Sequence, residues 1–182
     1  TGTNGKTTVV QMVRALIESA GLSVRVAGNI SPAALTALMD AYEQQHLPEV
    51  WVIELSSFQL EHTYSLPITA ATVLNISQDH LDWHGSMQAY IQAKKSIYAM
   101  SQKAVVNQDD PFLSTSSLEI ASITKFGMQL AMEEGSIGVT HQAGQPWLSA
   151  RLAEGKIQYL LPVGAMQVSG THNIANAMAA LA

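Results

Sequence analysis

The first eight residues, TGTNGKTT, have the composition of a loop that binds a phosphate group. Gly2 and Gly5 allow backbone N–H groups to converge on phosphate oxygens, and the apolar periodicity that follows predicts a helix whose N-terminus favours the same anion. Lys6 is placed to reach the β- and γ-phosphates of a nucleotide, and the Thr7 hydroxyl is placed to bind Mg²⁺. The alternative is a glycine-rich turn that only caps a helix. The Lys-Thr pair at the start of an amphipathic helix favours the phosphate site.

Glu54 stands at the end of the apolar run VWVIEL, which predicts a buried strand. In sheets of parallel strands the ligand site lies at the carboxyl ends of the strands. A carboxylate at that edge is suited to hold Mg²⁺ directly or through water. The alternative is a strand-end acid that faces solvent.

The stretch NISQDHLDWHGS follows another apolar strand and reaches the same edge. It places Asp79, His80, Asp82 and His84 within six residues. Imidazole and carboxylate groups together suit a divalent metal ion. A polar surface turn explains the same composition equally well, and Asp82 alone is also explained as the acid that begins a helix.

Two further groups lie on expected helices. Lys94, within QAKKSIY, has the pattern of a solvated surface lysine. His172, Asn173 and Asn176 open the last helix. Asn173 and Asn176 are three residues apart and share one helical face, so they offer amide donors and acceptors together. The alternative for this pair is helix capping.

The elements that must position these residues alternate between strands and helices. We expect strands over 23–28, 49–55 and 69–77, and a strand with a turn over 103–111. We expect helices from the phosphate loop to about Ala20, from Ser31 as N-cap to about Gln45, over 86–101, and from about Ser169 to the end. This order predicts an α/β fold with a mostly parallel sheet and flanking helices.

The residue pattern of the sequence changes near Leu118. From there to about Val168 the chain reads as short strands separated by glycine and proline, with two antiparallel hairpins over 135–164 that form a small meander packed on the main sheet. The chain begins at the phosphate loop without the strand that normally feeds it and stops within a helix, so we expect one excised module.

Composition limits the classes of function. The 182 residues are 47% hydrophobic and 13% charged, which predicts a folded domain with a substantial core. Without cysteine, disulfides and thiolate metal sites are excluded. The net charge of −5 and the scattered basic residues disfavour nucleic acid as a partner. No apolar run is long enough to span a membrane. We expect a soluble, cytoplasmic protein that handles a small anionic ligand.

These motifs in this order resemble the Mur ligase family, the ATP-dependent amide-forming ligases of peptidoglycan synthesis. The matching motifs run along essentially the whole chain: TGTNGKT at 1–7, GNI at 28–30, Glu54, N-x-x-x-D-H at 75–80, the helical Lys94 before a tyrosine, and G-x-H-N at 170–173. Within the family, ELSSFQLE at 54–61 with GNI upstream is most similar to the members that add D-glutamate to UDP-N-acetylmuramoyl-L-alanine.

The resemblance implies the domain organisation and the partners. Residues 1–182 correspond to a phosphate-loop NTPase-like central ATP-binding domain, with an N-terminal UDP-binding domain and a C-terminal amino-acid-binding domain outside this chain, so the isolated domain is expected to be inactive. The implied partners of the whole ligase are UDP-N-acetylmuramoyl-L-alanine and D-glutamate. Neither nucleic acid nor membrane is expected as a partner, and a monomer is expected.

The resemblance also implies the roles of residues. Lys6, His80 and Lys94 are the expected catalytic residues. ATP would be bound by the residues of the loop and of the last helix, namely Gly2, Thr3, Asn4, Gly5, Lys6, Thr7, Thr8, Asn173 and Asn176. Two Mg²⁺ ions are implied, one held by Thr7 and Glu54, the other by His80 and by Lys94 carbamylated with CO₂, with Lys95 as the alternative lysine. Asn29 and Ser56 are expected to face the muramoyl substrate.

Two other functions stay open at this point. A folylpolyglutamate synthase-like ligase shares the fold and the phosphate loop and also adds glutamate, although ELSSFQLE argues against it. A nucleotide-binding switch without ligase activity is compatible with the loop alone. The cluster around His80 and the pair Asn173 and Asn176 argue against a switch, because a switch needs no second metal site.

Overall fold

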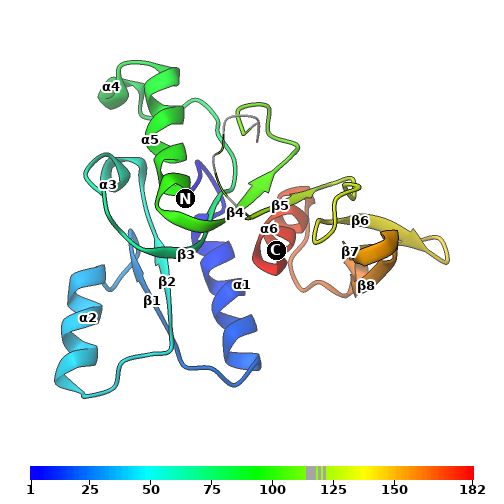
Figure 1. The fold of residues 1–182 in the computed structure, drawn as a ribbon, viewed down its shortest axis with the longest axis horizontal. Coiled ribbons are helices and arrows are strands. Elements are labelled where there is room, and N and C mark those ends of the chain that lie inside the picture. The colour runs from blue at the N-terminus through cyan, green and yellow to red at the C-terminus, as the bar shows by residue number, and fades with distance from the viewer. Residues whose placement is uncertain (114–117, 119, 121) are drawn as a thin grey trace.

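A computed structural model of the chain describes residues 1–113, 118, 120 and 122–182 and shows an α/β fold with two sheets (Figure 1). The smaller sheet pairs β1 (Val24–Gly28) with β2 (Val50–Glu54) in parallel. The larger sheet has the strand order β3-β4-β5-β6-β7-β8. Its strands are Ile68–Val73, Ser101–Asn107, Ser122–Gly127, Ile137–Gln142, Gln145–Arg151 and Ile157–Pro162. Strands β3 to β6 run parallel and β7 and β8 are antiparallel, which confirms the predicted fold class.

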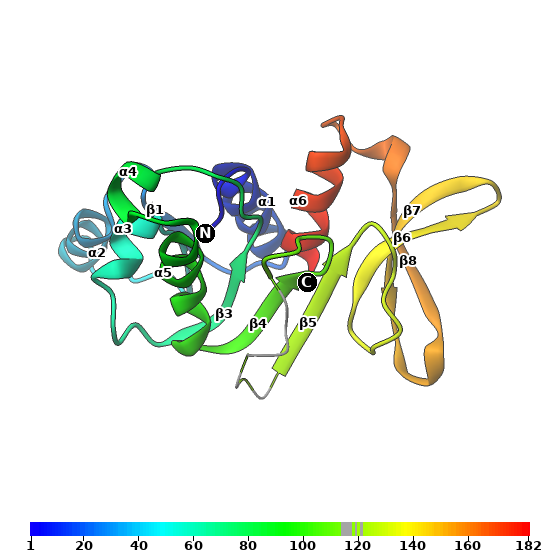
Figure 2. The ribbon, with the colours of Figure 1, turned by 90° about the horizontal axis from the view of Figure 1, so that it is seen from above.

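Helices flank the sheets. The α-helices among the described residues are α1 (Lys6–Ser19), α2 (Ala34–Glu43), α3 (Ser57–Glu61), α4 (Leu81–His84), α5 (Met87–Ala99) and α6 (Thr171–Leu181), with 3-10 turns at Ala153–Gly155 and Val163–Ala165. Helix α1 packs against α6, and α3 packs against α5. Figure 2 shows the β6–β8 meander at the opposite end of the molecule from α2 and α3. None of the helices in the described ranges has the length and apolarity that a membrane span requires.

Side chains of β4 alternate between two apolar cores. Ala104 and Val106 join the core that includes the buried tyrosines of α5, whereas Val105 joins the core that includes buried residues of α1 and α6. All three side chains are buried. This alternation follows from the two-residue repeat of a strand, and burial on both faces explains why β4 reads as a continuous apolar run.

Two predicted details around β1 and β2 differ in the structure. Helix α2 begins at Ala34 with Ala33 as N-cap, and no side chain caps it, so Ser31 is not the N-cap. The Pro32 carbonyl instead accepts a hydrogen bond from the Gly28 N–H, and the chain makes this turn before the helix starts. Strand β2 is half-buried along its apolar run rather than buried on both faces, because among the described residues it pairs only with β1.

The meander is part of the main sheet rather than a layer packed on it. Strand β6 pairs in parallel with the end of β5 through Phe126 with Ile137 and Gly127 with Gly138. One strand, β7, is shared by both hairpins. A Cβ at Gly138 would collide with the backbone of Leu130. The glycine therefore allows the segment around Leu130 to lie close against β6. The sequence did not predict the short helices α3 and α4, which follow β2 and β3.

Candidate functional site

The phosphate loop lies between the end of β3 and the first turn of α1. Backbone bonds tie Thr3 to Asn75, and the Asn75 side chain both accepts from the Asn4 N–H at 2.8 Å and donates to the Asn4 carbonyl at 3.0 Å. Gly5 is the N-cap of α1 in the left-handed conformation, and no side chain caps the helix. The first N–H groups of α1, including that of Thr8, are therefore oriented as an anion site requires.

The last helix closes the loop from one side. A Cβ at Gly5 would overlap the Oδ1 atom of Asn176, and the backbone of Gly5 has φ of 83°, so both space and conformation require glycine. Asn176 is buried. The structure thus brings the predicted loop and one of the two predicted asparagines into direct contact, although they are far apart in the sequence.

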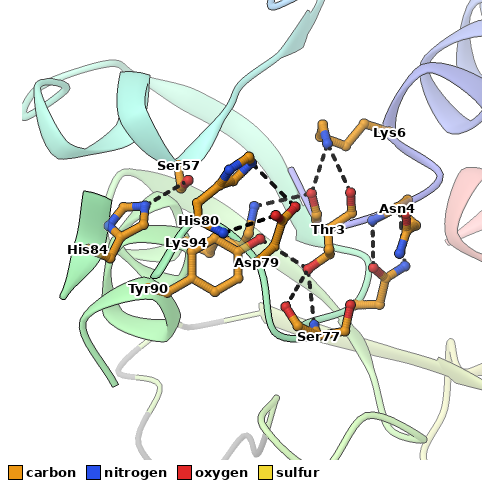
Figure 3. Close-up of polar contacts among 12 residues, drawn as sticks. Thr3, Asn4, Lys6, Ser57, Ser77, Asp79, His80, His84, Tyr90 and Lys94 are labelled. Carbon is orange, nitrogen blue, oxygen red and sulfur yellow. Dashed lines mark hydrogen bonds and ion pairs between the residues drawn. The ribbon is translucent and has the colours of Figure 1, made fainter. Parts of the chain in front are cut away.

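Two lysines converge on one carbonyl of the loop. Lys6 Nζ donates to the Gly2 oxygen at 3.0 Å and Lys94 Nζ donates to the same oxygen at 3.1 Å (Figure 3). Lys94 is only 2% exposed and lies over the Tyr90 ring, 4.7 Å from its centroid. Burial, and then the positive charge of Lys6, lower the pKa of Lys94 from 10.5 to about 8. Lys94 is therefore a buried site residue and not the solvated lysine that its helical pattern alone suggests.

Glu54 is buried at the carboxyl end of β2 and has two partners. The Thr7 hydroxyl donates to its Oε2 at 2.8 Å, and the Asn29 amide donates to its Oε1 at 2.9 Å. Gly28 makes this possible, because a Cβ there would collide with the Glu54 carbonyl oxygen. The strand-end acid therefore does not face solvent, and the GNI segment and the phosphate loop both meet it.

The four polar residues at 79, 80, 82 and 84 do not gather at one point in the structure. His80 begins α4 with a left-handed backbone, and its Nε2 lies 3.3 Å from the Asp79 carboxylate. Asp82 is an exposed acid in the first turn of α4, and His84 turns into the protein interior. Among residues 1–113, 118, 120 and 122–182, no three His, Cys, Asp or Glu side chains gather as a metal site. The four residues together are therefore not one metal cluster.

Tyr90 connects the loop to α5 and was missed from the sequence. Its hydroxyl lies 3.1 Å from the Thr3 Oγ1 atom, which in turn accepts from the Ser77 N–H at 3.0 Å (Figure 3). The available signal was its spacing, because Tyr90 precedes Lys94 by four residues and so shares its helical face. Thr3 is thereby held by its side chain, while its carbonyl accepts from Lys6 at 3.2 Å.

Ser56 and the short helix α3 follow Glu54 directly. Ser56 Oγ accepts from the Gln59 N–H at 3.2 Å, and the Gln59 side chain accepts from the Ser56 N–H at 2.9 Å. This reciprocal pair is a capping box, which explains why the polar stretch SSFQ forms a helix. The Ser56 side chain is thus engaged within the chain, next to the edge at which Glu54 lies.

A pocket of about 490 Å³ opens beside the phosphate loop. It is lined by Asn4, Gly5, Leu74, Asn75, Asn107, Phe126, His172, Ala175 and Asn176. Asn173 is not among the lining residues. Its amide donates to the Ser169 carbonyl at 2.7 Å and accepts from Asn176 at 3.4 Å, and no side chain caps α6, so the pair does not make the capping bond that was its alternative. The lining by Phe126 and Asn107 was not predicted.

Comparison with known proteins agrees with this geometry. The model of the Mur ligase middle domain matches residues 1–182. UDP-N-acetylmuramoylalanine–D-glutamate ligases of Bordetella avium and Cupriavidus metallidurans are 47% and 43% identical over the whole of this chain. The chain spans about 40% of the length of these relatives.

Solved structures share the fold at low sequence identity. MurF ligase from Thermotoga maritima in complex with ADP is 19% identical, with a TM-score of 0.66 over 99% of this chain and 42% of that one. FolC from E. coli in complex with DHPP and ADP is also 19% identical, with a TM-score of 0.62 over 99% of this chain and 51% of that one. These likenesses describe the fold, while the family match covers every residue. The chain therefore belongs to the Mur ligase middle-domain family.

Proposed function

We propose that this chain is the central ATP-binding domain of a ligase that joins D-glutamate to UDP-N-acetylmuramoyl-L-alanine through an acyl phosphate. The observation that carries the proposal is the phosphate loop: Lys6 and the open N-terminus of α1 lie together beside the Gly2 carbonyl, and the buried Lys94 reaches the same oxygen. A cation at a helix N-terminus forms a site for a highly charged anion. The substrates are taken from the names of the relatives that are 40–47% identical.

In this proposal ATP lies across the loop and the neighbouring pocket. The triphosphate meets the backbone of Gly2 to Thr8 and the Lys6 ammonium, and the adenine enters the pocket beside Asn176. Leu74 and Phe126 supply apolar contacts, and the Asn176 amide supplies a donor and an acceptor. The T. maritima and E. coli structures of the same fold hold ADP, which supports a nucleotide as ligand.

The residues present fit one Mg²⁺ ion at Thr7 and Glu54. Their oxygens lie 2.8 Å apart, and a buried carboxylate with a neighbouring hydroxyl offers the hard oxygen ligands that Mg²⁺ prefers. When bound, the ion neutralises phosphate charge. We assign a second Mg²⁺ to His80 and a carbamylated Lys94, whose side chains both lie against the Tyr90 ring.

Lys94 is suited to react with CO₂. It is buried, it shares a carbonyl with another lysine, and its hydrogen bond goes to a neutral oxygen rather than to a carboxylate. The lowered pKa increases the population of the neutral amine, which is the form that attacks CO₂. The product is an anion with two oxygens, so the modification replaces an unfavourable buried cation with a metal ligand.

The proposed reaction has two steps. The substrate carboxylate attacks the γ-phosphorus of ATP, the bond to ADP breaks, and Lys6 stabilises the charge on the transferred group. The D-glutamate amine then attacks the acyl carbon, loses a proton and displaces phosphate. Asn29 and Ser56 lie beside Glu54, at the edge where the muramoyl substrate would approach, and we assign them to its orientation.

The test uses the full-length ligase, since the matched relatives are about two and a half times as long as this chain. Phosphate release is measured with two acceptor pairs: UDP-N-acetylmuramoyl-L-alanine with D-glutamate, and a folate with L-glutamate. We expect turnover with the first pair only. Turnover with the folate pair would indicate a FolC-like ligase, and ADP binding without turnover under either condition would indicate a nucleotide switch. We further propose that the ligase acts in the cytoplasm and as a monomer. Analytical ultracentrifugation of the full-length ligase tests the monomeric state.

A further inference from the structure

Helices α3 and α4 are joined by a buried polar network outside the proposed nucleotide site. The His84 ring has both nitrogens engaged: Nε2 lies 3.0 Å from Ser57 Oγ and Nδ1 lies 3.1 Å from Glu61 Oε1. The His84 side chain is fully buried and Ser57 is 1% exposed. Figure 3 shows this histidine reaching from α4 to Ser57 on α3.

The directions of these hydrogen bonds follow from the acid. The Trp83 indole N–H donates to Glu61 Oε2 at 2.8 Å, and this bond is the main cause that lowers the pKa of Glu61. An ionised carboxylate only accepts, so Nδ1 of His84 carries a hydrogen and donates to Glu61. Nε2 of a neutral ring is then free to accept from the Ser57 hydroxyl. With these directions, both ring nitrogens of His84 have a hydrogen-bond partner.

The order acid, imidazole, hydroxyl is also that of a hydrolase triad, but the setting here differs. A nucleophilic serine must reach its substrate. Ser57 is buried in the first turn of α3 and does not line the pocket beside the phosphate loop. The network therefore has the chemistry of a structural connection between two helices.

Its position links the two loops that carry the candidate metal ligands. Ser57 follows Glu54 by three residues, and His84 follows His80 by four. Between them, the Phe58 ring stacks on His84 at an angle of 6° and 5.7 Å, and contacts His80 at 4.9 Å. The His80 ring, 44% exposed, is thus supported by α3 on one side and by Asp79 on the other.

We propose that Ser57, Glu61 and His84 form a positioning latch that fixes the His80 loop relative to Glu54. The proposal rests on the proposed ligase function, in which both loops carry Mg²⁺ ligands. When the latch is loosened, α4 is free to shift and His80 moves with respect to Lys94, the residue with which it would hold the second Mg²⁺. Ser57, Glu61 and His84 do not line the pocket proposed for the base, so we expect Asn176 to keep its contacts.

The test measures turnover of the full-length ligase with UDP-N-acetylmuramoyl-L-alanine and D-glutamate. At saturating ATP, free Mg²⁺ is titrated for Ser57→Ala and Glu61→Gln. A misplacement of about 1 Å in a catalytic group costs up to about a hundredfold in rate, so we expect kcat to fall about tenfold and the half-saturating Mg²⁺ concentration to rise about threefold. The KM for ATP should stay within about twofold of wild type.

Thr63→Val is the matched control. Thr63 lies just after α3 and its hydroxyl donates to the Gln59 carbonyl at 2.7 Å, so this variant removes a hydroxyl, as Ser57→Ala does, and leaves the contacts of His84 in place. We expect wild-type Mg²⁺ dependence for this variant. Glu61→Gln keeps the size of the side chain and lies partly at the surface, so it tests the latch even where Ser57→Ala folds poorly.

The outcomes separate the two proposals. A wild-type ligase that does not turn over with these substrates overturns the proposed function and this inference with it. A working wild type, with variants that lose thermal stability but keep kcat and Mg²⁺ dependence, overturns the latch alone and leaves a purely structural network. Equal changes in KM for ATP and in Mg²⁺ dependence also overturn it, because they indicate general loosening of the site.

Discussion

Removal of CO₂ is the sharpest perturbation of the proposed site, because it acts on one side chain. If Lys94 must be carbamylated, the full-length ligase in CO₂-depleted buffer should lose activity and regain it when bicarbonate is added. The amount of CO₂ needed depends on how much of Lys94 is neutral. That quantity follows from its burial and from Lys6, which together lower its pKa from 10.5 to about 8.

The size of the effect is calculated from this shift. At pH 7 a lysine with a pKa of about 8 is about 9% neutral, whereas one with a pKa of 10.5 is about 0.03% neutral. The site therefore increases the reactive amine roughly 300-fold at pH 7. Carbamate formation from the neutral amine releases one proton, and the ammonium form must lose another proton first. As the pH rises, the CO₂ concentration that gives half activity should then fall about a hundredfold per pH unit up to pH 8, and about tenfold per unit beyond it.

The assay is phosphate release at fixed dissolved CO₂ concentrations between pH 6.5 and about 9.5, normalised at each pH to the activity at saturating CO₂. This normalisation removes the titration of other groups from the result. We expect the slope to change near pH 8. A steep dependence that continues through the whole range would show that Lys94 keeps its ordinary pKa, and activity that is independent of CO₂ would show that no carbamate is needed.

Substitution provides the control for this experiment. Lys94→Ala should be nearly inactive and should regain activity with acetate, which supplies an anionic oxygen ligand in the vacated space. Rescue by an alkylamine instead would mean that Lys94 acts as a cation. Lys95→Ala is the matched neighbour, on a side chain that is not buried, and should keep its activity and its CO₂ dependence. Loss of both in Lys95→Ala would assign the modification to Lys95.

Three further predictions concern the nucleotide and its metal. Lys6→Ala should reduce ATP turnover by about a hundredfold or more, since a cation at the transferred phosphate is lost; turnover within about tenfold of wild type would contradict this role. Glu54→Gln should raise the Mg²⁺ requirement more than the KM for the acceptor, because the amide keeps the shape without the charge, and an unchanged Mg²⁺ titration would remove Glu54 from the metal site. Asn176→Ala should raise the KM for ATP about fivefold and relax discrimination against GTP, whereas Asn173→Ala should mainly lower the melting temperature; the reverse pattern would place Asn173 at the base.

The alternation of strands and helices was predictable, because short apolar strands that alternate with amphipathic helices favour a parallel sheet flanked by helices. The burial of each strand was not, since Val105 and Val106 of β4 are buried in different cores while the longer apolar run of β2 is only half-buried. The start of α2 was not predictable, because Ser31 and Pro32 form a good N-cap signal and the competing bond from Gly28 to Pro32 depends on the neighbouring turn. The continuity of the meander with the sheet was also hidden, since it depends on two residue pairs between β5 and β6.

The site was predictable in its residues more than in its contacts. The phosphate loop and Glu54 belong to local patterns whose chemistry is specific, and the structure brings Thr7 and Glu54 together. Contacts between distant segments carry no local pattern. The overlap of Gly5 with Asn176 and the bond of His84 to Ser57 join residues that only the fold makes neighbours. The sequence therefore identified the chemical groups, and packing determined which groups meet.

The pair of lysines suggests why the modification and the phosphate loop belong together. Before modification, Lys6 and Lys94 both donate to the Gly2 carbonyl, and the positive charge of Lys6 disfavours the ammonium form of Lys94. Carbamylation changes the sign of the charge on Lys94, so the same proximity becomes an attraction. Lys6 then donates to the Gly2 and Thr3 carbonyls and keeps one N–H for an anion. In the proposed site, the lysine that lowers the pKa of Lys94 would therefore both promote the reaction with CO₂ and stabilise the carbamate, which would supply a second anionic ligand without a further acidic residue.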